Sequence, residues 1–258
     1  MTRRSLIKTT ERSLRIAKLF ELKILSDFIL EDLDCEDIDT YLSRDLDKAS
    51  LIPYMCREKA SESYLADILD SLDLYHWNTS NTKLLYSEKS GSSISFLEKI
   101  NRDHILDLVA EEIIRDYREN FSSYTLETYM RGVEYLFLLR ESGEWIVLEG
   151  ERFRVEAPRL EDVIASIHTH PGSSCIPSRE DLETAIDLLS NKGVLAGISS
   201  CRCLFILRSR DPIDEETYSQ LMHYLNNYDD FLDFLSNLAS SSATINNKVI
   251  LEIRSGVC

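Results

Sequence analysis

The segment VIASIHTHPGSSCIPSRED, residues 163–181, decides the fold class of this chain. Residues 163–170 are rich in apolar and β-branched side chains, which predicts a strand, and the Pro-Gly pair that follows would end it. Ser178 and Asp181 have the spacing of a helix N-terminus, with a capping serine and an acidic third helical residue. A strand that passes through a short loop into a helix favours an α/β fold.

The flanking sequence continues this alternation of strands and helices. Apolar periodicity predicts the following elements: a helix at 102–117, a hairpin of strands 134–140 and 145–148, a helix at 178–190, one or two strands within 194–207, a helical stretch at 215–238 and a last strand at 247–253. Residues 103–258 are therefore predicted to form a mixed β-sheet flanked by helices.

The N-terminal part of the chain has a different character. Residues 1–75 are predicted to be helical, because apolar residues between positions 14 and 29 recur at helical spacing among charges. Residues 78–95, rich in Ser, Asn, Thr, Lys and Gly, are the predicted linker. We therefore expect a helical N-terminal extension over residues 1–100, which could recognise a substrate, bind a protein partner or simply cover the sheet.

Charge and composition limit the classes of partner. Lys and Arg number 29 against 45 Asp and Glu, so the formal net charge is −16. This balance opposes binding to nucleic acid or to an anionic membrane surface, because both are polyanions. It suits a basic protein partner or simply a well-solvated acidic surface.

Hydropathy and cysteine usage predict a cytoplasmic protein. No targeting segment is recognisable, and no apolar run approaches the roughly 20 residues that a membrane-spanning helix needs. The six cysteines are scattered without a Cys-x-x-Cys pair. We interpret most of them as buried thiols, since free cysteine is often buried and cytosolic thiols are usually reduced.

His168, His170 and Asp181 form a candidate metal-binding set. Residues two apart on a strand lie on one face, roughly 6.6 Å apart along the chain, so both histidines can reach one cation. Asp181 would add an anionic third ligand. Three protein ligands leave a position open for water, whose pKa a zinc ion lowers to about 7, as expected of a catalytic site. Taken singly, the histidines could be polar residues on an open strand face and Asp181 part of a helix cap.

The complete pattern, His-x-His-Pro followed by Pro-Ser-x-x-Asp, resembles the signature of the JAMM zinc metalloproteases, also called the MPN-plus or JAB family. Residues 166–182 are especially similar to small archaeal members. The resemblance covers residues 103–207 and does not reach residues 1–100. It implies a JAB/MPN-like, cytidine-deaminase-like sandwich with one Zn²⁺ per chain. It also implies that Ser178 polarises the scissile carbonyl and holds the oxyanion.

The same resemblance implies a glutamate general base at the head of an apolar strand upstream of the histidines, where this chain has Glu134. A carboxylate that begins such a strand also needs a reason to be there, because an unpaired buried charge is costly. Glu127 is the alternative base, and Glu134 could instead be a surface carboxylate at a strand end.

The implied activity is that of a metallopeptidase or isopeptidase that processes a ubiquitin-like modifier. The first alternative is a non-catalytic MPN-type scaffold, and the second is a DNA-repair-associated JAB-like protein. A hydrolase of small molecules or of a sulfur-carrier protein stays open as well. Each alternative shares the motif but differs in substrate or in the absence of turnover.

Two further sets of residues have weaker interpretations. Cys175 lies between the histidines and Asp181, and a disulfide to Cys201 or Cys203 would brace that loop. The other three histidines lack metal-ligand spacing and are interpreted as surface or packing residues; they are His76, His104 and His223.

Overall fold

The computed structural model describes residues 4–54, 61–85, 97–152, 161–238, 242–256 and 258. The chain divides into two compact units, unit 1 with Met1–Ser13 and Ala110–Cys258, and unit 2 with Leu14–Val109. Within the described ranges, no helix combines the length and the apolar character that a membrane span requires.

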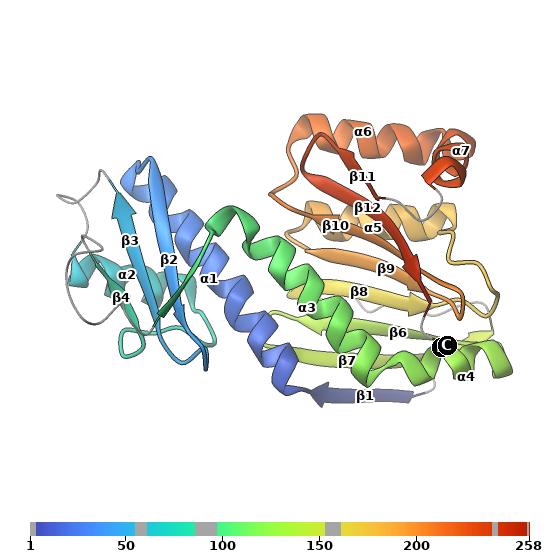
Figure 1. Cartoon of the computed structure of the whole chain (residues 1–258), viewed down its shortest axis with the longest axis horizontal. Coiled ribbons are helices and arrows are strands. Elements are labelled where there is room, and N and C mark those ends of the chain that lie inside the picture. The colour runs from blue at the N-terminus through green and yellow to red at the C-terminus, as the bar shows by residue number, and fades with distance from the viewer. Residues whose placement is uncertain (1–3, 55–60, 86–96, 153–160, 239–241, 257) are drawn as a thin grey trace. The chain divides into compact units, whose positions relative to one another are not determined.

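Unit 1 contains an eight-stranded mixed sheet (Figure 1). Its strands are β1 (Arg4–Thr9), β6 (Val133–Arg140), β7 (Glu144–Arg152), β8 (Val163–Thr169), β9 (Leu195–Ser199), β10 (Cys203–Ser209), β11 (Ser242–Ile245) and β12 (Val249–Ser255). They lie in the order β1-β7-β6-β8-β9-β10-β12-β11. Only β8 and β9 are parallel, and every other neighbouring pair is antiparallel. The candidate ligands thus lie near the middle of the sheet.

Helices flank both faces of this sheet (Figure 1). They are α3 (Ile105–Asn120) and α4 (Ser122–Arg131) on one face, and α5 (Arg179–Ser190), α6 (Glu215–Asn226) and α7 (Tyr228–Leu238) on the other. On the α3 side, Phe137 packs edge-on against Tyr117 and near Phe121, which also contacts Trp145. The opposite core joins apolar residues of α5, α6 and α7 to β9, β10 and β12. The predicted mixed sheet flanked by helices is confirmed.

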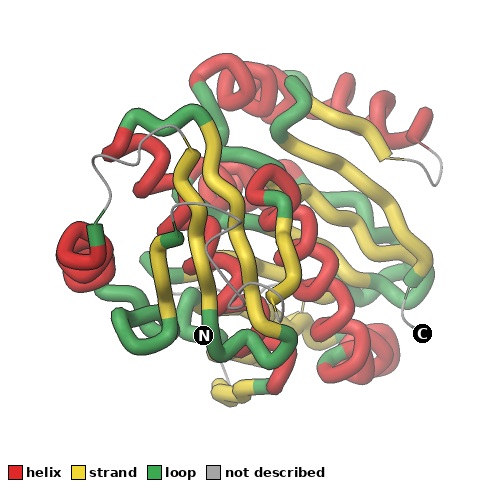
Figure 2. Tube along the Cα trace, turned by 60° about the vertical axis from the view of Figure 1, so that its left-hand side comes forward, coloured by secondary structure: helices red, strands yellow, loops and turns green. Residues whose placement is uncertain are grey.

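Unit 2 is also mixed α/β, and Figure 2 shows its four strands side by side. Its elements are α1 (Glu11–Leu33, which starts in unit 1), β2 (Asp37–Ser43), β3 (Ala49–Tyr54), α2 (Glu62–Leu72), β4 (Thr82–Leu84), β5 (Leu97–Ile100) and a short 3₁₀ turn (Arg102–His104). The sheet order is β4-β3-β2-β5, in which only β3 and β4 are parallel.

The prediction that residues 1–75 are helical is wrong for three segments, and β5 also lies within the expected helical extension over residues 1–100. β1 pairs with β7 in the large sheet, and β2 and β3 form a hairpin in the small one. In β2, the alternate residues Ile38, Thr40 and Leu42 lie on one face of the strand and are buried, a strand pattern that the neighbouring acidic residues concealed. Of the predicted linker, residues 82–84 form β4, and residues 86–95 lie outside the described residues.

Candidate metal centre

The end of β8 and the start of α5 position the three predicted ligands. His168 lies in β8 and His170 directly follows it, and the backbone N–H of His170 donates to the carbonyl of Ser199 at 2.9 Å. That bond continues the pairing with β9 beyond the strand, so both imidazoles stay on the same face of the sheet. Asp181, the third residue of α5, approaches from the helix that covers this face.

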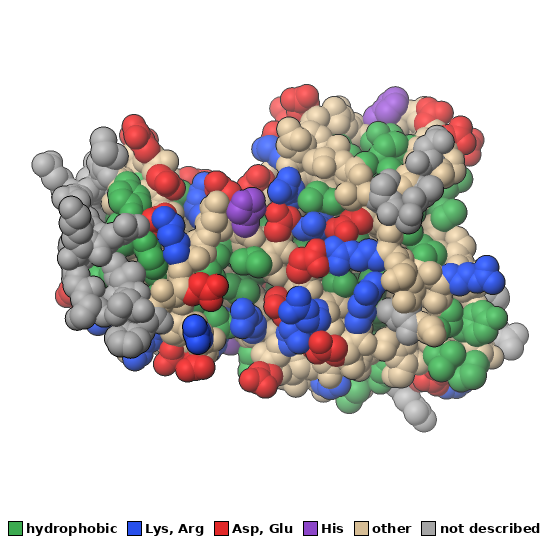
Figure 3. Space-filling view, in the orientation of Figure 1, with side chains coloured by type: hydrophobic (Ala, Val, Ile, Leu, Met, Phe, Trp, Pro, Cys, Tyr) green, Lys and Arg blue, Asp and Glu red, His purple; other side chains and the backbone are tan. Residues whose placement is uncertain are grey.

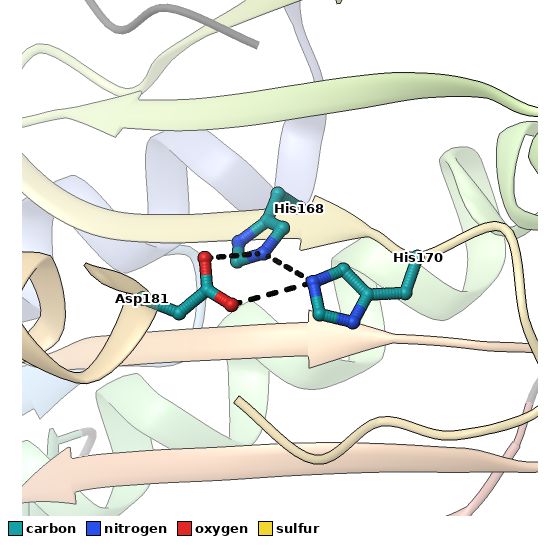
Figure 4. Close-up of side chains that lie close together, drawn as sticks. All are labelled: His168, His170 and Asp181. Atoms are coloured by element: carbon teal, nitrogen blue, oxygen red, sulfur yellow. Dashed lines mark hydrogen bonds and ion pairs between the residues drawn. The ribbon is translucent and has the colours of Figure 1, made fainter. Parts of the chain in front are cut away.

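The three side chains converge and form a triangle of residues (Figure 4). The two Nε2 atoms are 3.0 Å apart, and they lie 3.2 Å and 3.4 Å from Oδ1 and Oδ2 of Asp181. Zinc bonds of about 2.0–2.1 Å to nitrogen and oxygen correspond to a tetrahedral edge of roughly 3.3 Å. The two histidines and the carboxylate therefore lie close enough together to bind one small divalent cation.

The surroundings of this triangle suit an open metal site. The side chains of His168, His170 and Asp181 are only partly exposed. Within the described ranges, no fourth His, Cys, Asp or Glu side chain joins the group. Burial raises the pKa of Asp181, but hydrogen bonds from the two histidines lower it more, so the net pKa lies far below its usual value. The carboxylate therefore stays anionic, as a metal ligand must be.

A capping box holds Asp181 in place. The Oγ of Ser178 accepts the backbone N–H of Asp181 at 3.1 Å, and Oδ2 of Asp181 accepts the backbone N–H of Ser178 at 2.7 Å. The predicted helix cap is confirmed, and it does not compete with the ligand role. The same hydrogen bond that caps the helix fixes the rotamer that turns both carboxylate oxygens toward the histidines.

The loop between the histidines and α5 is fastened at three points. A disulfide joins Cys175 to Cys203. Ser200 Oγ donates to the carbonyl of Ser173 at 3.2 Å, and the hydroxyl of Tyr228 donates to the carbonyl of Pro177. The loop that carries the chain from one ligand to the next is thus tied to β10 and to α7.

The interpretation of most cysteines as buried thiols is wrong. Besides the Cys175–Cys203 bond, a second disulfide joins Cys201 to Cys258, and Cys35 is disulfide-bonded as well. The hypothesis of a loop-bracing disulfide is confirmed, with Cys203 as the partner. The sequence could not choose between Cys201 and Cys203, because a Cys-x-Cys pair on one strand end offers two sulfurs at similar distance.

Glu134 lies at the start of β6 on the side of the sheet that carries the ligands. Leu136, two residues later and on the same face, pairs in register with His168. Burial raises the pKa of Glu134 and the charge of Asp181 adds to the rise, while the two histidines act in the opposite direction; the net pKa is raised. No described residue hydrogen-bonds its carboxylate, which leaves Glu134 free to exchange a proton.

Local backbone geometry aims this side chain. α4 ends at Gly132, whose positive φ of 70° is the left-handed conformation that favours glycine, and β6 begins at the next residue. The β6–β7 register then shifts between Val133 and Tyr135, so that two residues of β7, Gly150 and Glu151, lie opposite Glu134 in a bulge of β7. Bulges commonly redirect a side chain next to a functional site.

Glu127 and the remaining histidines lie apart from the triangle. Glu127 forms an ion pair with Arg131 on α4 and a hydrogen bond with the side chain of Tyr135. Because Tyr135 alternates with Glu134 along β6, its side chain lies on the opposite face of the sheet. None of the other described histidines belongs to a metal-ligand group.

Comparison with known proteins adds no relative, since neither a protein-family model, nor a curated protein, nor a solved structure matches the chain. The candidate site therefore depends on its own geometry. Sequence reasoning also missed α4 and one buried residue that α4 contacts, Thr169, between the two histidines. The only signal for Thr169 was its position between two ligands.

Proposed function

We propose that this protein is a zinc-dependent hydrolase of the JAMM type that cleaves an amide or isopeptide bond. The observation that carries the proposal is the convergence of His168, His170 and Asp181, whose nitrogen and oxygen atoms approach one another to 3.0, 3.2 and 3.4 Å, close to the roughly 3.3 Å edge of a zinc tetrahedron. When bound, a zinc ion supplies a Lewis acid and a nucleophilic water at neutral pH.

Glu134 is the proposed general base. Its carboxylate is buried, has a raised pKa and lies within electrostatic range of all three ligands. In this role it takes a proton from the attacking water and delivers it to the leaving amine. A base placed in this way contributes about 10²–10⁴-fold to the rate. Glu127 is a weaker candidate, because Arg131 already neutralises it.

Ser178 is the proposed group that holds the developing oxyanion. Its Oγ already accepts the N–H of Asp181, which leaves the hydroxyl proton to be donated outward. The partial positive charge at the N-terminus of α5 adds to that donation. A single donor of this kind is worth about 10²–10³-fold in kcat where it stabilises an oxyanion.

The substrate and the finer fold rest on the resemblance of residues 166–182 to JAMM proteases. We propose a JAB/MPN-like arrangement for unit 1 and a ubiquitin-like protein, or its conjugate, as substrate. An extended modifier tail can add to a protein as a further strand, a common mode of peptide recognition. A protein partner of the N-terminal extension belongs to the same proposal.

The disulfides bear on where such an enzyme works. Disulfides are rare in the cytosol, except in hyperthermophiles, and two of them meet at the Cys201–Cys203 segment next to the site. A cytoplasmic location is therefore compatible with the disulfides chiefly in a hyperthermophilic organism. Free-thiol titration of protein purified from its native cells, with alkylation at lysis, tests this point directly.

Two alternatives share the motif. A non-catalytic scaffold does not need a complete set of metal ligands, so the convergence of His168, His170 and Asp181 favours catalysis. A DNA-repair role requires a basic surface, whereas acidic and basic side chains are interleaved over α3 on the face drawn in Figure 3. Glu111 of α3 and Glu252 both form ion pairs with Arg254. Together with the net charge of −16, this mixed surface favours a protein substrate.

The decisive experiment measures metal content and hydrolysis on the same preparation. A ubiquitin-like protein joined through its C-terminal glycine to a lysine side chain serves as substrate, with and without 1,10-phenanthroline. We expect one zinc per chain and cleavage that stops with chelator and returns with added zinc. Protein that folds but binds no zinc would overturn the metal centre, and zinc-replete protein that cleaves neither isopeptide nor peptide substrates would favour the scaffold.

A further inference from the structure

Two buried threonine hydroxyls lie on the face of the sheet opposite to the candidate metal centre. Thr169 stands between His168 and His170 in the chain, but its side chain lies on the opposite face of the sheet, where it is fully buried. Its Oγ1 is 2.7 Å from Oγ1 of Thr128, a fully buried residue of α4. Neither hydroxyl can contact the candidate metal centre from that face, so neither acts as a metal ligand and their role lies in the structure around it.

The hydroxyl of Thr169 takes the place of a backbone acceptor in the sheet. The regular pairing between β6 and β8 extends to the pair Leu136–His168. Just beyond this pair, towards the start of β6, the register between β6 and β7 shifts. At that point the backbone N–H of Tyr135 donates to Oγ1 of Thr169 at 2.9 Å. One side chain thus satisfies a buried amide that the irregular strand pairing would otherwise leave without a partner.

The backbone N–H that donates a hydrogen bond to Thr169 belongs to the peptide bond between Glu134 and Tyr135. Thr169 is itself bonded through its backbone to both histidine ligands. The 2.9 Å hydrogen bond is therefore a direct link from the proposed general base to the proposed ligand pair, made on the far side of the sheet. Thr128 completes the link, because its hydroxyl holds Oγ1 of Thr169 and belongs to the helix that leads into β6.

We propose that Thr169 is a positioning residue that holds Glu134 in register with the two histidines. This inference rests on the proposed function, since it takes Glu134 as the general base. Loss of the hydroxyl leaves the ligand atoms in place but frees the Tyr135 amide, so the start of β6 can shift against β8 and move the carboxylate of Glu134. A displacement of about 1 Å at a reacting group can cost about 100-fold in rate.

The test compares Thr169→Val, which keeps the shape and removes the hydroxyl, with Thr169→Ser, which restores it. We expect Thr169→Val to lower kcat by about 10–100-fold, in the range of other outer-shell changes, with KM and the zinc dissociation constant within about twofold of wild type. Thr169→Ser should return kcat to within about threefold. Thr128→Val should act in the same direction with a smaller loss, and it serves where Thr169→Val fails to fold.

A matched control lies on the same helix. Thr125 of α4 is equally buried, and its Oγ1 hydrogen-bonds Tyr117 at 2.9 Å and Ser199 at 3.0 Å without reaching the backbone of β6. Thr125→Val removes a comparable hydroxyl, so it should lower the melting temperature while kcat stays at the wild-type value. Equal losses of kcat in Thr125→Val and Thr169→Val would reduce Thr169 to a general stabilising role and overturn the inference.

Amide hydrogen exchange separates this inference from the proposed function. The Tyr135 amide should be protected in wild type and in Thr169→Ser and should exchange much faster in Thr169→Val, whether or not a substrate is cleaved. If wild-type protein binds zinc but hydrolyses nothing, the proposed function fails, and Tyr135 protection still reports on the link. Unchanged Tyr135 protection in Thr169→Val would overturn the positioning role by itself.

Discussion

Two carboxylates on opposite faces of the large sheet show the difference between a structural acidic residue and a candidate metal ligand. Asp116 of α3 is fully buried, and its two oxygens accept hydrogen bonds of 2.8–2.9 Å from Thr10, Asn120 and Trp145. Asp181 of α5 is partly exposed and accepts one backbone N–H. The rest of its acceptor capacity faces two imidazoles.

The donors around each carboxylate explain this difference. Neutral donors on three segments of the chain surround Asp116, so it connects the start of α1 to α3 and β7 and has no capacity for a ligand. The oxygens of Asp181 instead face two imidazoles within 3.4 Å, and imidazole nitrogens can bind a cation in place of a proton. A carboxylate whose partners can themselves bind a metal is therefore the better candidate for a functional site.

The largest expected effect is that of Asp181→Asn. Asparagine can still cap α5, but it removes the charge that a divalent cation requires. We expect zinc affinity to fall by more than about 100-fold, beyond the 10–100-fold cost of outer-shell changes, with no detectable hydrolysis. Competition with a fluorescent zinc chelator measures the affinity. Asp187→Asn, an exposed position on the same helix, is the matched control and should bind zinc as wild type does.

Glu134→Gln separates chemistry from metal binding. The amide keeps the size of the side chain but cannot accept the proton, so kcat should fall by about 10²–10⁴-fold while zinc stoichiometry stays at one per chain. Single-turnover kinetics on the isopeptide substrate measures the loss. The parallel variant Glu127→Gln should retain activity within a few-fold. Reversed results, with Glu127→Gln inactive and Glu134→Gln active, would transfer the role of the base to α4.

Asp116→Asn should produce the opposite pattern to Asp181→Asn. The new amide nitrogen would face Trp145 Nε1 or the side-chain amide of Asn120, both of which are donors, so at least one buried hydrogen bond is lost. We expect unfolding to become easier by about 1–3 kcal/mol, with zinc affinity unchanged. Urea unfolding and zinc titration on the same sample check both halves. A loss of zinc affinity here would break the distinction between the two carboxylates.

The sequence alone predicted the surroundings of Asp181 better than those of Asp116. The convergence of the candidate ligands, the capping serine and the order of elements from β6 to α7 follow local rules of spacing and periodicity, so they were accessible without coordinates. Asp116 is a structural residue because it accepts hydrogen bonds from Thr10 and Trp145, which are distant in the sequence. No local sequence pattern predicts such contacts. β1 is a strand only because β7 pairs with it. Thr169 similarly depends on a bulge in another strand.

The smallest expected effect is that of Glu111→Gln, because Glu111 is more exposed than Asp116 or Asp181. Its side chain is 42% exposed, and a hydrogen bond from Arg254 lowers its pKa despite the opposing effect of partial burial. A lowered pKa in the folded state means stability that is present above the unfolded pKa of about 4.3 and is lost as pH falls through the folded pKa. Solvent screening limits such a pair to about 0–1 kcal/mol. Glu111→Gln should therefore reduce the free energy of unfolding slightly at pH 7 and not at all near pH 2, measured by urea titration at both values.

A loss of stability that persists undiminished at low pH would mean that Glu111 acts through packing on Arg254 rather than through its charge. The pair would then resemble the closed environment of Asp116.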